Sequence, residues 1–144
     1  MSTNNGMNIK ITVKDFTPEV KAALENAIAR ALVSLGATAE GFARDIIVGA
    51  GRVDTGRLQG SITHREGDDF TAIGTDVEYA IYHEVGTGIY ASEGGGRQTP
   101  WRYKDANGQW HVTRGVKPLH FLKNAVADNT DEYKRIIKES LENA

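Results

Sequence analysis

One short run in this chain begins like a metal-binding motif. His83-Glu84 matches the start of the H-E-x-x-H motif, in which two histidines four residues apart on a helix bind zinc and the glutamate acts as general base. Position 87 is occupied by Thr87, so the second histidine ligand is missing. We therefore predict no metal site here, and we expect His83 at the surface or at a helix end.

A second run, Asp54-Thr55-Gly56, has the letters of the aspartic protease triplet. That chemistry needs two facing carboxylates, which a dimer can supply. In those enzymes the triplet follows an apolar strand, whereas Gly49-Ala50-Gly51-Arg52 precedes it here. A small hydrolase that uses Asp54 or the His83/Glu84 pair remains the alternative hypothesis. Bound metal, or an activity lost in His83→Ala, would favour it.

A third run, from Gly86 to Ala91, spells G-x-G-x-x-A. The dinucleotide fingerprint with these letters follows a strand and opens a helix. Here the run follows a predicted helix and opens none, so a nucleotide site is not predicted. The sequence contains no convincing Ser-His-Asp order or phosphate-binding loop. We therefore expect neither catalysis nor a cofactor.

Length and composition narrow the remaining classes. The 144 residues fit a single domain, residues 1–144. A formal net charge of -2 creates no overall field for nucleic acid or an anionic membrane, so we expect neither as a specific partner. The absence of cysteine excludes disulfides and thiolate chemistry and fits a cytosolic origin. No apolar run reaches the roughly 18 residues of a membrane span, and the N-terminus does not resemble a signal peptide.

The N-terminal part of the chain predicts a strand followed by a long helix. Ile9, Ile11 and Val13 alternate with polar residues, which indicates a half-buried strand over residues 8–13. Thr17-Pro18 is a typical helix start, and apolar residues then recur every three or four positions to about residue 48. Gly36 and Gly41 within this helix indicate a bend or a close approach by another backbone. The helix is long for one small sheet to cover, so part of its apolar stripe packs either within the chain or against another subunit.

The centre of the chain predicts turns and short elements. Asp54-Thr55-Gly56 is turn chemistry, in which the Asp54 carboxylate accepts backbone N–H groups or caps a one-turn helix over residues 55–58. Residues 61–65 and 70–75 are predicted strands, joined by a turn at Gly67-Asp68-Asp69. Residues 78–84 indicate a short helix that Gly86 ends.

Residues 86–115 form a predicted flexible insertion, rich in glycine around residues 94–96. Within it, Asn107-Gly108 lies between two aromatic runs and predicts a hairpin that makes Trp101, Tyr103 and Trp110 cross-strand neighbours. Exposed aromatic clusters often mark interfaces, so we predict that these three residues contact a partner and that the insertion becomes ordered on docking. The last helix starts after Pro118, with an interruption predicted at residues 128–130.

Three ordered blocks in this sequence resemble a bacteriophage family described as a putative tail component. The blocks are VDTGRLQGSI at residues 53–62, GTDVEYAIYHEVGT at residues 74–87 and PLHFLKNA at residues 118–125. One difference is His120, which is inserted in the P-F-L part of the third block. The resemblance implies structural roles for the residues that match the family pattern: Asp54, Thr55, Gly56, Leu58, Ser61, Gly74, Tyr79, Glu84, Gly86, Thr87, Pro118, Phe121 and Leu122.

The resemblance also implies a place in a virus particle. Members of this family complete the tail or join it to the head in long-tailed phages. The expected partners are therefore the head connector, tail-terminator or tail-tube proteins, in a hexameric ring whose subunits can stay monomeric when free. The expected location is the neck or tail of the virion, after synthesis in the bacterial host cytoplasm. Together with the element pattern, it predicts an α+β fold in which the long N-terminal helix and the C-terminal helix pack on one face of a small, mostly antiparallel sheet. We expect this sheet to contain residues 8–13, 61–65 and 70–75 and the two tryptophan arms.

Overall fold

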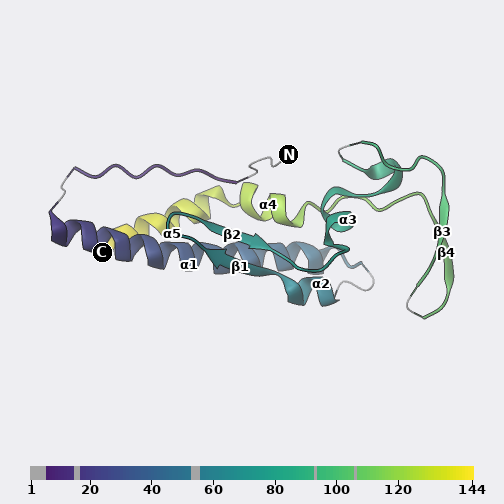
Figure 1. Cartoon of the computed structure of the whole chain (residues 1–144), viewed down its shortest axis with the longest axis horizontal. Helices are drawn as coiled ribbons and strands as arrows, with labels where there is room; N and C mark the ends of the chain where they lie inside the picture. The colour runs from purple at the N-terminus through teal and green to yellow at the C-terminus, as the bar shows by residue number, and fades with distance from the viewer. Residues whose placement is uncertain (1–5, 15–16, 53–55, 93, 106) are drawn as a thin grey trace.

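The long helix α1, Pro18–Gly49, is the element against which the rest of the body packs (Figure 1). We describe residues 6–14, 17–52, 56–92, 94–105 and 107–144 of a computed structural model. The Thr17 hydroxyl accepts the backbone N–H of Val20 at 3.3 Å, and Pro18 occupies the first turn, as predicted. The buried positions of α1 are mostly small, which lets neighbouring elements approach it closely.

A β-hairpin lies along one side of α1. Its strands, β1 (Thr63–Glu66) and β2 (Thr71–Gly74), are antiparallel, with His64 opposite Ile73. The Gly67 N–H donates to the Phe70 carbonyl at 2.8 Å and closes the predicted turn. Gly36 marks the closest approach, because a Cβ placed there would lie 2.6 Å from both the His64 ring and the Thr71 hydroxyl. The predicted approach by another backbone is therefore wrong at both glycines, because the neighbours of Gly36 are side chains and Gly41 has open space around it.

Two C-terminal helices run back along α1 in the opposite direction (Figure 1). They are α4 (Phe121–Ala127) and α5 (Thr130–Glu142), and the predicted interruption at residues 128–130 separates them. The Tyr133 hydroxyl donates to the Ala125 carbonyl, and its ring meets Phe42 edge-on at 6.2 Å between centroids. Burial raises the pKa of Tyr133 to about 12, so the phenol keeps the proton that this hydrogen bond needs.

The core lies where α1, α4 and the short helices α2 (Gly56–Ser61) and α3 (Ala80–Val85) meet. Its largest side chains are fully buried, and burying each one stabilises the fold by roughly 1.5–3 kcal/mol. These large core residues are Phe121, Ile47, Leu58 and Ile62.

The tryptophan arms form a second hairpin of their own. Strand β3 (Trp101–Lys104) pairs antiparallel with β4 (Trp110–Thr113), and this hairpin projects from the end of the body (Figure 1). The short 3-10 helix η1 (Gly88–Tyr90) lies in the segment that leads toward it. The prediction that these arms belong to the main sheet is wrong, because β1–β2 and β3–β4 are separate two-stranded sheets.

Residues 7–13 form neither a helix nor a strand, so the strand predicted over residues 8–13 is also wrong. The segment instead passes over a cavity of about 1240 Å³ bounded by α1, β2, α4 and α5. Ile9 and Ile11 line this cavity and remain 41% and 37% exposed. The alternation of apolar and polar residues therefore reflects an extended segment with one half-buried side. Such a segment does not need to pair with another strand.

The predicted α+β class is confirmed, with the elements of the body gathered around α1. The sheet and the C-terminal helices both pack against this helix.

Candidate assembly site

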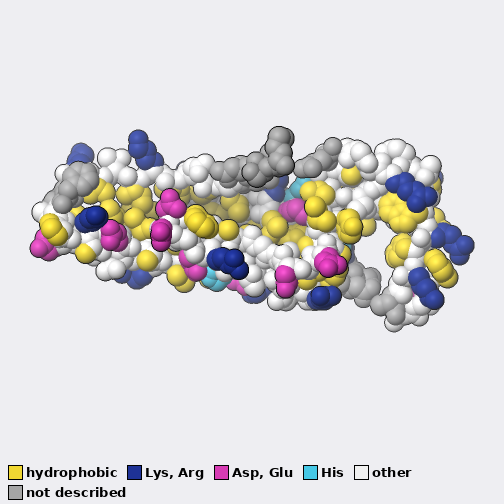
Figure 2. All heavy atoms as spheres, in the orientation of Figure 1, with side chains coloured by type: hydrophobic (Ala, Val, Ile, Leu, Met, Phe, Trp, Pro, Cys, Tyr) yellow, Lys and Arg dark blue, Asp and Glu magenta, His cyan; other side chains and the backbone are white. Residues whose placement is uncertain are grey.

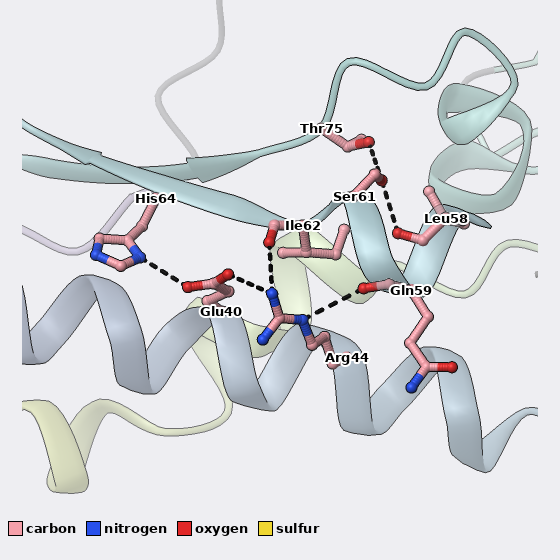
Figure 3. A network of polar contacts seen from close by, with 8 residues as sticks. All are labelled: Glu40, Arg44, Leu58, Gln59, Ser61, Ile62, His64 and Thr75. Carbon is pink, nitrogen blue, oxygen red and sulfur yellow. Dashed lines mark hydrogen bonds and ion pairs between the residues drawn. The ribbon is translucent and has the colours of Figure 1, made fainter. Parts of the chain in front are cut away.

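Arg44 on α1 holds the C-terminal end of α2 (Figure 3). Its guanidinium donates to the carbonyls of Gln59 at 3.3 Å and Ile62 at 2.9 Å. Carbonyls at the end of a helix have no partner within it, so a cation there satisfies them and complements the helix dipole. The first motif block is thereby fastened to the long helix.

Glu40 connects this contact to strand β1. One carboxylate oxygen pairs with Arg44 at 2.5 Å, and the other lies 2.7 Å from Nδ1 of His64 (Figure 3). The other ring nitrogen of His64 lies 3.3 Å from Glu66. Sequence reasoning missed these residues. The only signal was the spacing of Glu40 and Arg44, a favourable charge pair four apart on a helix.

Ser61 links the first motif block to the second. Its hydroxyl lies 2.5 Å from that of Thr75 and 2.7 Å from the Leu58 carbonyl, to which it donates (Figure 3). Thr75 in turn accepts the Val77 N–H at 3.1 Å. The two blocks on either side of the β1–β2 hairpin are joined through these hydroxyls.

Glu84 links the second block to the third. Its carboxylate accepts the backbone N–H of Leu122 at 2.8 and 3.1 Å and that of Lys123 at 3.1 Å. His120, which precedes α4, adopts the left-handed conformation with φ 49°. The His120 side chain does not cap α4, so the acid from the second block supplies the missing acceptor.

Gly86-Thr87-Gly88 packs against residues 114–116, which closes the base of the insertion. The Thr87 N–H donates to the Val116 carbonyl at 2.9 Å, and the Thr87 hydroxyl accepts the Val116 N–H at 2.9 Å. A Cβ at Gly88 would lie 1.9 Å from the Arg114 carbonyl oxygen, and Gly88 has φ +62°. Only glycine fits this approach between two backbones.

His83 and Glu84 bind different partners. Nδ1 of His83 lies 3.1 Å from a guanidinium nitrogen of Arg52, which also donates to the Lys117 carbonyl. Burial, and secondly the charge of Arg52, lower the pKa of His83. Of the pair named in the hydrolase hypothesis, His83 thus contacts Arg52 and Glu84 contacts the start of α4. Within the described ranges no group of three or more His, Asp or Glu side chains has an arrangement that could hold a metal ion.

The other predicted motif residues have the following positions. Asp54 and Thr55 lie outside the described residues, and Gly56 begins α2. Leu58 and Phe121 belong to the core, against which Tyr79 and Leu122 pack while partly buried. Gly74 ends β2, and Pro118 lies beside Gly86.

The projecting hairpin has two different faces. Tyr103 pairs with His111 and stacks on it at 5.2 Å between centroids, and Trp101 and Thr113 share that face. Lys104 pairs with Trp110 on the opposite face, where the Arg102 guanidinium lies 5.1 Å from the indole centre. The prediction that Trp110 neighbours Trp101 and Tyr103 is therefore wrong. Val112 completes the second face, which we call the cationic face: Arg102, Lys104, Trp110 and Val112.

Asp105 organises the loop of the hairpin. One carboxylate oxygen accepts the N–H groups of Asn107 and Gln109, both at 2.9 Å, and the other lies 2.6 Å from the His111 ring. The bond to His111 is the main reason why the pKa of Asp105 is lowered. The loop thus holds the strands in one register.

No protein-family model, curated protein or solved structure matches the chain. In the part of the chain that the structure describes, no helix is long and apolar enough to cross a membrane.

Proposed function

We propose that the protein is a structural component of a phage neck or tail end. In this role it completes the tail and joins it to the head connector as a ring, and it carries out no chemistry. The proposal rests on the three motif blocks that resemble the phage tail-component family. The ring is hexameric, and its neighbours in the particle are the connector, tail-terminator or tail-tube proteins.

The contacts of the motif residues support this role. Ser61 binds Thr75, and Glu84 binds the start of α4, so the blocks act as internal fasteners of one fold. Side chains used in this way stabilise the fold and do not take part in a reaction. A resemblance carried by such residues is therefore a resemblance of architecture, which suits a structural protein.

The single observation that carries the assembly role is the exposed hairpin. Trp110 is 59% exposed and Val112 is 70% exposed, although both lie in a regular strand. An isolated two-stranded hairpin is marginal in water, so its apolar side chains gain stability from a partner. A projecting element of this kind is a natural contact for a neighbour in a particle.

The proposal is tested by deleting the gene from the phage or prophage that encodes it. We expect full heads and separate tails in electron micrographs of the lysate, and rescue when the wild-type gene is supplied in trans. Intact particles with normal infectivity would overturn the proposal. A gene order with head genes on one side and a tail-tube gene on the other is also expected.

A hairpin-deletion variant separates assembly from folding. Residues 89–112 are replaced by a short Gly-Ser linker, which keeps the bonds between Thr87 and Val116. Circular dichroism should show an unchanged helical fold, while the variant should fail to join heads to tails. Particle assembly at the wild-type level would show that the hairpin is not the joining element.

A further inference from the structure

The segment that contains the hairpin carries a charge opposite to that of the rest of the chain. Residues 97–117 contain five Lys and Arg residues and one Asp, a net charge of +4, and Arg102, Lys104 and Asp105 give the hairpin itself a net charge of +1. The whole chain carries -2, so the remaining residues carry -6. Figure 2 shows dark-blue and yellow side chains together on the hairpin, while acidic side chains lie over the body. The hairpin therefore fits a surface that is acidic and partly apolar.

Such a surface is present on the chain itself, at α3. Ile81 is 59% exposed and Tyr82 is 55% exposed on this helix. Glu78, in the turn that leads into α3, and Asp76 just before it are also exposed. Ile81 and Tyr82 follow Glu78 by three and four residues, a spacing that places them beside it on a helical turn. We call Asp76, Glu78, Ile81 and Tyr82 the α3 patch.

We propose that the cationic face of one copy docks on the α3 patch of a second copy. Arg102 and Lys104 would meet Asp76 and Glu78, while Trp110 and Val112 would cover Ile81 and Tyr82. Both surfaces are exposed within a single copy, so neither is already covered by the other. The interface rests on the proposed ring assembly and names the surfaces that build the ring.

A second copy fits this face better than nucleic acid does. Phosphates would bind Arg102 and Lys104 but would leave Val112 uncovered. An apolar patch edged by carboxylates satisfies both kinds of side chain. Because two different surfaces meet, the contact is head-to-tail, and such contacts repeat around a ring or along a filament.

The contact between two free copies should be weak. A stable pair usually buries about 800 Å² on each partner, and a face of four side chains offers less. A copy inside a ring makes two such contacts, one through each surface. This explains how the subunits can stay apart at low concentration and assemble once neighbours are held in place.

The test uses two charge-reversal variants of the full chain. Arg102→Glu/Lys104→Glu reverses the cationic face, and Asp76→Lys/Glu78→Lys reverses the α3 patch. Lys21→Glu/Lys134→Glu is the matched control for the first variant, because it makes the same charge change at exposed positions on α1 and α5. Sedimentation and light scattering are measured over increasing protein concentration at low salt, with circular dichroism to confirm folding.

We expect the average molar mass of the wild type and of the control to increase with protein concentration. Each reversal should raise the dissociation constant at least about tenfold, because like charges would then meet. The decisive result is the mixture of the two reversal variants: each should be monomeric alone, and together they should associate. That rescue also excludes loss of hairpin folding as the cause.

Three outcomes would overturn the inference. They are a wild type that stays monomeric at the highest attainable concentration, reversal variants that associate normally, and a mixture that stays monomeric. Salt-sensitive binding to a DNA duplex, lost in Arg102→Glu/Lys104→Glu while no self-association occurs, would assign the face to nucleic acid. The gene deletion is a separate readout: rescue in the mixture with intact particles after deletion would retain the interface and reject the neck role.

Discussion

The carboxylate of Glu84 caps helix α4 by accepting the backbone N–H of Leu122 at 2.8 Å. These residues lie on either side of the hairpin insertion, so the bond fixes the two ends of that insertion to each other. The same segment adds backbone bonds, from the Leu119 N–H to the His83 carbonyl at 2.7 Å and from the His120 N–H to the Glu84 carbonyl at 3.1 Å. We therefore expect the rest of the fold to persist when the hairpin is removed.

Replacing Glu84 should destabilise the fold through α4. Glu84→Ala leaves the first N–H groups of the helix without their acceptor, and we expect a loss of about 1–2 kcal/mol in the free energy of unfolding. Glu84→Gln keeps an acceptor and should lose less. Urea denaturation measures both, with Glu25→Ala, exposed on α1, as the control. Equal stability of Glu84→Ala and the control would reject the capping role.

Two glycines of α1 should respond in opposite ways to alanine. Gly41→Ala meets open space and should stabilise the protein by up to about 1 kcal/mol through helix propensity. Gly36→Ala forces a Cβ against His64, which Glu40 holds in place, and against Thr71. We expect overpacking to outweigh propensity and to destabilise by about 1–2 kcal/mol. Thermal denaturation of the two variants and the wild type measures these changes in stability. A stabilised Gly36→Ala would mean that β1 and β2 can shift at little cost.

Local patterns predicted the helices and the two hairpins, but they did not predict the strand pairing: the alternation at residues 8–13 has no partner strand, and the register of the second hairpin differs from the predicted one. Thr17-Pro18 and the apolar spacing located α1, because both signals lie within a few residues of each other. The face of Trp110 depended on loop length. A two-residue turn at Asn107-Gly108 would place Trp110 on the same face as Trp101. The longer loop between Lys104 and Trp110 shifts the strand register by one residue, which places Trp110 on the opposite face. The bonds of Arg44 to α2 have no local signature, since their carbonyl partners are identified only by the fold.

Stability should fall in mild acid because of His83. The Arg52 guanidinium donates to Nδ1, so the folded state holds this imidazole neutral, and its pKa lies below the usual value of about 6.5. The unfolded chain then binds the proton more readily, and the stabilising contribution is present above about pH 6.5 and lost as the pH falls below it.

Comparing His83→Gln with the wild type isolates this contribution. Glutamine keeps an acceptor for Arg52 but does not titrate. Urea denaturation at pH 7.5 and pH 5 should show a smaller pH effect in the variant. Identical losses in both proteins would show that His83 is not the source of the pH dependence.

The N-terminal segment should act as a cover for the cavity beside α1. Ile9 and Ile11 line that cavity together with apolar residues of α1, β2 and α5, but they stay partly exposed and are in no strand. Removing residues 2–13 should therefore open an apolar surface while leaving the core around Phe121 intact. We expect stronger fluorescence of a bound hydrophobic dye and a loss of roughly 1–3 kcal/mol, below that of two fully buried isoleucines. Ile9→Ser/Ile11→Ser should reproduce the dye signal, whereas Val33→Ser, at a position 53% exposed on α1, should not. Unchanged dye binding in both the truncated protein and the double variant would show that the segment does not cover the cavity.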